Sequence, residues 1–136
     1  MWKIAFVLFV ASGLAQTMNP LVGTWQRIAD PQAPPAILLI SADGYYAQIA
    51  IPTGRSKPRH DFDNMTREEL MKQFGGVRAS YGTYKVSGNK LTRRLTAGVN
   101  PGNEGAEAVQ QFRIEGDDLV LKALDAKGES RFRRMK

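Results

Sequence analysis

The chain has 136 residues, no cysteine and a formal net charge of +6, with its lysines and arginines spread along the sequence. This length suits one domain with its own apolar core, and the lack of cysteine excludes a disulfide-stapled module. Scattered positive charge is typical of a soluble surface rather than of a nucleic-acid-binding face, so we expect no nucleic-acid partner.

Residues 1–15, MWKIAFVLFVASGLA, have the layout of a secretory signal peptide, with one charge at Lys3, an apolar run and small residues before Gln16. The apolar run is too short for an ordinary membrane-spanning helix. We therefore expect cleavage after residue 15, which leaves residues 16–136 as one domain without an integral span. An uncleaved N-terminal anchor is the alternative. Export without cysteine favours a secreted or periplasmic bacterial protein.

The first half of this domain alternates short apolar runs with turn signals. Strands are expected over residues 23–29, 36–40 and 45–51, separated by a proline-rich loop and an Asp-Gly turn. Thr66 and Glu69 then form a capping box that begins the one expected helix, over residues 66–74. Its Leu70, Met71 and Phe74 share an apolar face at helical spacing, and two glycines end it.

The second half returns to a period of two. Five more strands are expected: residues 78–86, 91–97, 107–114, 119–124 and 129–135. Eight evenly spaced strands joined by tight turns predict an all-β fold. Because hairpins follow one another without long crossovers, we expect an eight-stranded antiparallel up-and-down barrel, with one short helix between strands 3 and 4.

Two hairpins allow a register to be predicted. A two-residue loop at Gly88-Asn89 pairs Tyr84 with Arg93 and Gly82 with Leu95, and a loop at Gly116-Asp117 pairs Ile114 with Leu119. The apolar members select the inward face: Val86, Leu91, Leu95, Phe112, Ile114, Leu119 and Leu121. Tyr84 and Arg93 point inward with them. The alternative register places Arg93 outside, with Arg94 inside or also in solvent.

Several stretches, in order over nearly the whole domain, resemble the lipocalin-like domain family of bacteria and fungi, within the wider calycin architecture. They are LVGTW, SADGYYAQ, TREEL, YGTYKV, VNPGNEGAEAVQQFRIEGDDL and RFRR. The resemblance implies a barrel closed at one end by an arginine of the last strand stacked on the tryptophan of G-x-W. For this chain those residues are Gly23, Trp25 and Arg134. Histidines often follow the YGTY strand in that family, whereas this chain has Arg93 and Arg94.

An arginine among apolar lumen side chains must be paired or it is costly. Its partner is a ligand carboxylate, the Tyr84 hydroxyl or an internal acid, and the inward strands offer few acids. An eight-stranded barrel can hold one small ligand, so we favour a carboxylate bound by Arg93 and Tyr84, with Gln48, Tyr46 and Tyr81 as further cavity-lining candidates. His60 lies in H-D-F-D, but adjacent residues on a polar loop do not supply the converging ligands of a metal site. No G-x-S-x-G elbow is present, and no cofactor is implied.

We therefore expect an exported lipocalin-like protein that binds a small, mainly hydrophobic or amphipathic ligand in its barrel. One alternative is an isomerase or cyclase using the same cavity, with Arg93 stabilising an anion and Tyr84 donating a proton. A third possibility is an envelope protein with a filled barrel that acts through its outer surface. Fold alone does not choose among them, although binding is favoured over catalysis.

Overall fold

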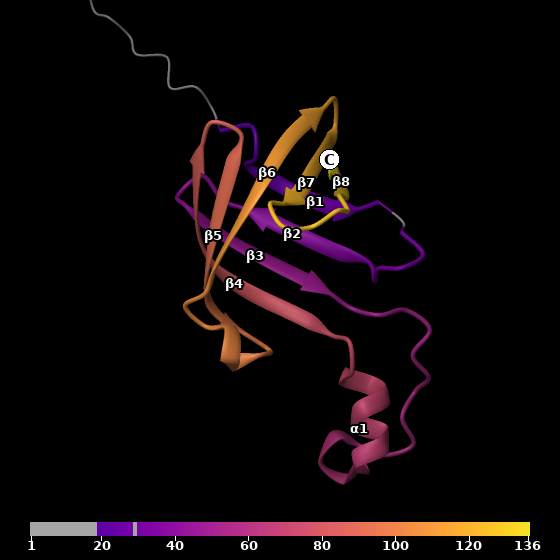
Figure 1. The fold of residues 1–136 in the computed structure, drawn as a ribbon. Coiled ribbons are helices and arrows are strands. Elements are labelled where there is room, and N and C mark those ends of the chain that lie inside the picture. Colours follow the sequence, from indigo (N-terminus) through magenta and orange to yellow (C-terminus); the bar gives the residue numbers. More distant parts are fainter. Residues whose placement is uncertain (1–18, 29) are drawn as a thin grey trace, which may run out of the picture.

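Eight antiparallel strands form a closed barrel in the computed structural model, which describes residues 19–28 and 30–136 (Figure 1). The expected signal peptide therefore lies outside the described residues, as does Ala29 at the expected end of the first strand. The strands are β1 (Gly23–Arg27), β2 (Ala36–Ile40), β3 (Tyr45–Ala50), β4 (Arg78–Ser87), β5 (Lys90–Gly98), β6 (Glu107–Glu115), β7 (Asp118–Ala123) and β8 (Ser130–Arg134). Each strand pairs with the next in the chain, and β8 pairs back with β1. The predicted eight-stranded antiparallel barrel is confirmed.

The two ends of the barrel differ in their connections. The hairpin end carries the turns β2–β3, β4–β5 and β6–β7, and the loop end carries the longer connections β1–β2, β3–β4, β5–β6 and β7–β8. Gly88 and Gly116 begin the turns of the last two hairpins with φ values of +59° and +61°, which glycine adopts at low cost. Both predicted registers are confirmed, because Tyr84 pairs with Arg93 and Ile114 pairs with Leu119.

A bulge in β5 opposite β4 shapes the lumen. Tyr81 pairs with Ala97 while Gly82 pairs with Leu95, so the register shifts between them. A Cβ at Gly82 would collide with the backbone carbonyl of Arg94. The missing side chain thus permits a close approach of the two backbones. It also means that no side chain projects from β4 into the lumen at this point.

The hairpin end holds the apolar core. Its fully buried side chains come from the inward faces of the strands and from the segment before β1: Leu21, Trp25, Leu38, Leu91, Leu119 and Phe132. Phe112 and Ile114 pack against this cluster, as the predicted alternation requires. Val86 lies at the rim of this end with 37% of its surface exposed, so its inward position is not a buried one.

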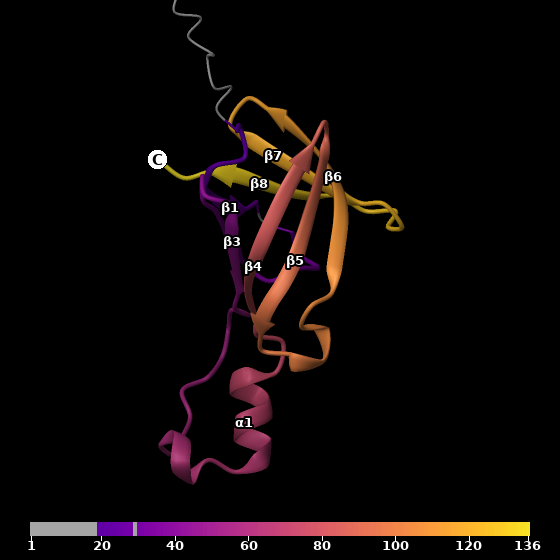
Figure 2. The same cartoon turned by 90° about the vertical axis from the view of Figure 1, so that its left-hand side faces the viewer.

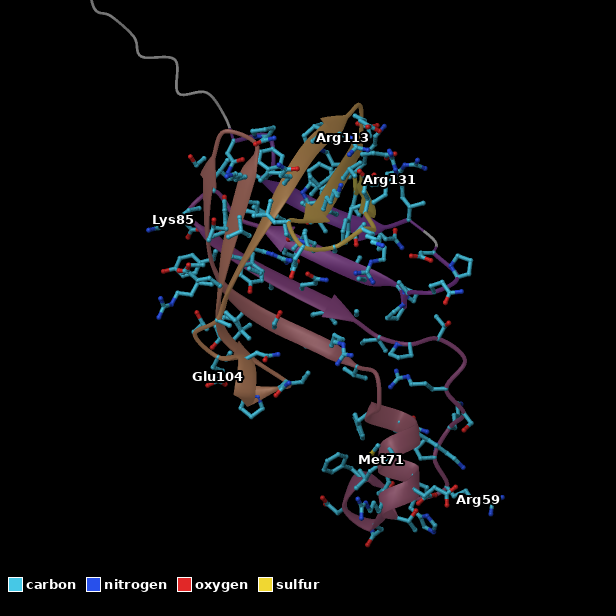
Figure 3. The ribbon with its side chains drawn as sticks, in the orientation of Figure 1. Arg59, Met71, Lys85, Glu104, Arg113 and Arg131 are labelled. Atoms are coloured by element: carbon cyan, nitrogen blue, oxygen red, sulfur yellow. The ribbon has the colours of Figure 1, made fainter. Side chains whose placement is uncertain are left out.

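The outer face of β6, β7 and β8 carries a network of ion pairs (Figure 3). Arg113 contacts Glu115 at 2.6 Å and Glu129 at 2.7 Å, and Arg131 contacts Glu115 at 2.8 Å. Hydrogen bonds from Arg113 lower the pKa values of both glutamates. Val120 pairs with Arg113 and with Arg131 in the sheet and is only 1% exposed although it faces outward. The two arginines therefore shield an apolar residue on the outer wall.

Helix α1 (Arg67–Phe74) projects from the loop end, away from the strands (Figures 1 and 2). Its N-terminus has the predicted capping box, formed by Thr66 and Glu69. None of its residues is buried, and the expected apolar face stays open, with Met71 65% exposed. Phe74 instead packs edge-on against Phe62 of the short 3₁₀ helix η1 (Phe62–Asn64), with ring centroids 5.6 Å apart.

Candidate functional site

Arg93 occupies the middle of β5 and extends across the lumen face of β4. Its Nη1 donates to Oε1 of Gln48 at 2.8 Å, and its Nη2 donates to Oε1 of Gln110 at 2.7 Å. The guanidinium also lies over the ring of Tyr46, 5.2 Å from the centroid. Gln48 and Tyr46 belong to β3, so Arg93 reaches past β4, where Gly82 leaves room. Three of the four predicted ligand-binding residues are thereby brought together.

The charge of Arg93 has no acidic counterpart in the part of the chain that the structure describes. The ion pairs found there do not include it. Its Nε is buried without a hydrogen-bond partner. Burial lowers the pKa of the Arg93 guanidinium from its usual range, yet arginine stays protonated at neutral pH. Two neutral amides and one ring thus surround a cation that they do not neutralise.

A cavity of about 270 Å³ adjoins this cation at the loop end of the barrel. Tyr46, Gln48 and Arg93 line it together with the apolar Leu95 and Ala108. Asn103 and Glu107 also line it, and Glu107 faces the outward Arg94 at 3.9 Å. The space therefore combines apolar side chains with one cationic group, hydrogen-bonding amides and the carboxylate that faces Arg94, and a few placed polar groups among apolar ones are usual in a small-ligand site.

Tyr84 takes no part in this cluster. Its hydroxyl donates to the Ser41 carbonyl at 2.6 Å and accepts from Nδ2 of Asn19 at 3.1 Å, both at the hairpin end. Burial raises the pKa of the Tyr84 hydroxyl. The expected partnership of Tyr84 with Arg93 is therefore limited to their backbone pairing. The neighbouring Tyr81 points outward and is 54% exposed.

Gln110 is the site residue that the sequence analysis missed. It lies on β6 two positions before the inward Phe112, and it pairs with Leu91 and Ala123. The alternation that places Phe112 and Ile114 inside also places Gln110 inside. A polar residue in phase with an apolar inward face was the signal that could have found it.

The hairpin end is closed by the three residues that the resemblance implies. The guanidinium of Arg134 lies over the Trp25 ring, 4.1 Å from the centroid. It donates to the carbonyls of Val22 and Pro20, both at 2.8 Å. Gly23 has φ +146°, and a Cβ there would lie 2.5 Å from Nη1 of Arg134. Glycine is therefore required at this position by both conformation and space.

His60 is hydrogen-bonded to a carboxylate of helix α1. Its Nδ1 lies 3.0 Å from Oε2 of Glu69, the residue that also closes the capping box. Among residues 19–28 and 30–136, no group of three or more acidic, histidine or cysteine side chains is arranged to hold a metal ion. Within the same residues no helix has the length and apolarity needed to cross a membrane.

Comparison with known proteins gives a distant similarity among solved structures. No protein-family model matches the chain, and no curated protein matches it. Among solved structures, an uncharacterized protein from Bacteroides eggerthii DSM 20697 is similar with 14% identity and a TM-score of 0.45. The match covers 84% of this chain and 98% of that one.

Proposed function

We propose that this protein is an exported, lipocalin-like up-and-down barrel that binds a small, mainly apolar molecule bearing an acidic group. The observation that carries the proposal is Arg93, a lumen cation without an acidic partner beside a cavity of about 270 Å³. The G-x-W of β1 under Arg134 supports the lipocalin-like assignment. The layout of residues 1–15 supports export.

The chemistry of the cluster favours an anion. Gln48 and Gln110 direct their amide oxygens at Arg93, so their NH₂ groups remain as donors. The buried Nε of Arg93 is a further unused donor. A carboxylate entering the cavity would accept hydrogen bonds from such donors and neutralise the guanidinium, and each charge-assisted bond is worth roughly 1.5–3 kcal/mol.

Binding is the function that we propose rather than turnover. The isomerase considered from the sequence would need Tyr84 to donate a proton near Arg93. Tyr84, the candidate from the sequence, has its hydroxyl bonded to Ser41 and Asn19 instead.

The test is calorimetric titration of matched carboxylates and alcohols, aliphatic and aromatic, against the wild type and Arg93→Met. The wild type should bind each acid at least about tenfold more tightly than its alcohol, the factor that one charge-assisted hydrogen bond supplies. Arg93→Met should remove that preference. Methionine fits an apolar wall, so the fold should persist.

The matched control is Arg133→Met, because Arg133 lies on the outer face of β8, does not line this cavity and has 64% of its side chain exposed. This variant should keep the preference for acids. Equal affinities of acid and alcohol in the wild type, or a preference that survives Arg93→Met, would mean that Arg93 does not anchor a ligand.

A further inference from the structure

A second arginine faces the barrel interior from the opposite wall. Arg27 ends β1, two residues after the inward Trp25, and pairs with the buried Phe132 of β8. Its guanidinium lies over the Phe132 ring, 5.4 Å from the centroid. In the closed order of eight strands, β1 and β5 are four apart, so Arg27 and Arg93 lie on opposite sides of the lumen.

The surroundings of Arg27 repeat those of Arg93. Arg27 Nη1 donates to a neutral oxygen, the Pro34 carbonyl at 3.0 Å. Its Nε is buried without a partner, and Arg27 Nε and Arg93 Nε are the two such side-chain atoms in the described ranges. No ion pair found among these residues includes Arg27. Two interior cations on facing walls therefore both lack a neutralising acid.

A larger cavity, of about 740 Å³, opens beside Arg27 at the loop end. Pro34, Pro35 and Pro52 give it apolar walls, while Arg78 adds a second cation and Asp30 one carboxylate. Because two arginines and one carboxylate line it, the balance of charge at this mouth is positive. The space suits a polar group that carries negative charge.

Building on the proposed function, we infer that the ligand carries two acidic groups, one held by Arg93 and the other by Arg27. The chemical class is an elongated dicarboxylate, or an amphipathic acid with a second anionic group at its far end. A monoacid would leave one of the two half-buried guanidinium groups without a counter-charge, which is the costlier arrangement.

The experiment titrates straight-chain monocarboxylates and α,ω-dicarboxylates of equal carbon number, over a series of lengths, by calorimetry. At the length that spans the two guanidinium groups, the wild type should bind the diacid at least about tenfold more tightly than the monoacid. In Arg27→Met the ratio of the two affinities should fall to near one, and Arg27→Lys should retain part of it. The control Arg133→Met, on the outer face of β8 beside β1, should leave the ratio unchanged.

Equal affinities of diacid and monoacid at every length overturn the inference, as does a preference that survives Arg27→Met. The comparison of diacid with monoacid is made on the wild type. The inference can therefore be refuted even if Arg27→Met folds poorly. If monoacids bind through Arg93 without any gain from a second acid, the proposed function stands and only the inference fails. If no acid is preferred over its alcohol, both fail.

Discussion

Removing Trp25 tests the closure of the hairpin end. Trp25 is fully buried, and its Nε1 donates to the Leu21 carbonyl at 2.8 Å. Trp25→Ala should lower the free energy of unfolding by about 3–5 kcal/mol, as truncation of a core aromatic does. Arg134→Ala loses the stacking on Trp25 and two hydrogen bonds to carbonyls. Because its guanidinium is partly exposed, we expect a smaller loss of about 2 kcal/mol.

The two losses should not add. Once Trp25 is absent, Arg134→Ala no longer removes the cation–π contact, so the double variant should be about 1 kcal/mol more stable than the sum of the single losses predicts. The assay is urea unfolding followed by circular dichroism. Tryptophan fluorescence is unsuitable, because Trp25 is the one tryptophan of residues 16–136 and the variant removes it. Arg133→Ala is the control, since Arg133 points outward with 64% of its side chain exposed, and it should combine additively with Trp25→Ala. Additive losses for Arg134→Ala as well would refute an energetic role for the contact.

Three further outcomes are expected. N-terminal sequencing of the exported protein should begin at Gln16, and an intact apolar segment would contradict cleavage. Gly82→Ala should lower the urea midpoint markedly because its Cβ meets a backbone carbonyl of β5, whereas Gly128→Ala, which meets open space, should change it little. The lowered pKa values of Glu115 and Glu129 mean that their stabilising effect is complete above the ordinary carboxyl range near pH 4 and is lost as the pH falls through the lower folded-state values. The urea midpoint should therefore hold from pH 7 to 5 and fall below about pH 4, and the glutamine variants should flatten that fall; an unchanged slope would contradict the assignment.

Local patterns predicted the strands and the positions that depend on strand alternation. The turn at Gly88 determined the pairing of Tyr84 with Arg93, since side-chain direction in a hairpin follows from the loop length. The stacking of Arg134 on Trp25 was predicted only from the resemblance to a known family, because it joins the first and last strands. Both results concern residues whose partners follow from pairing between neighbouring strands or from a known motif.

Contacts that cross the barrel could not be predicted in this way. Arg93 contacts Gln48 although β5 and β3 are not adjacent strands. The contact depends on how the strands are tilted and on Gly82, which places no side chain between them on β4. Tyr84 turns towards Asn19, 65 residues away in the sequence, for the same kind of reason. The open apolar face of α1 is a third case, because helical periodicity shows which residues share a face but not whether anything covers it.

The pairing of β8 with β1 means that the barrel can close only after the last strand is available. Gly23–Arg27 and Ser130–Arg134 are more than a hundred residues apart, and each leaves the other with an unpaired edge until they meet. A nascent chain cannot complete this seam before β8 has been synthesised, and contacts of such long sequence separation form slowly. A barrel of this topology therefore keeps two unpaired strand edges until its last strand has been made.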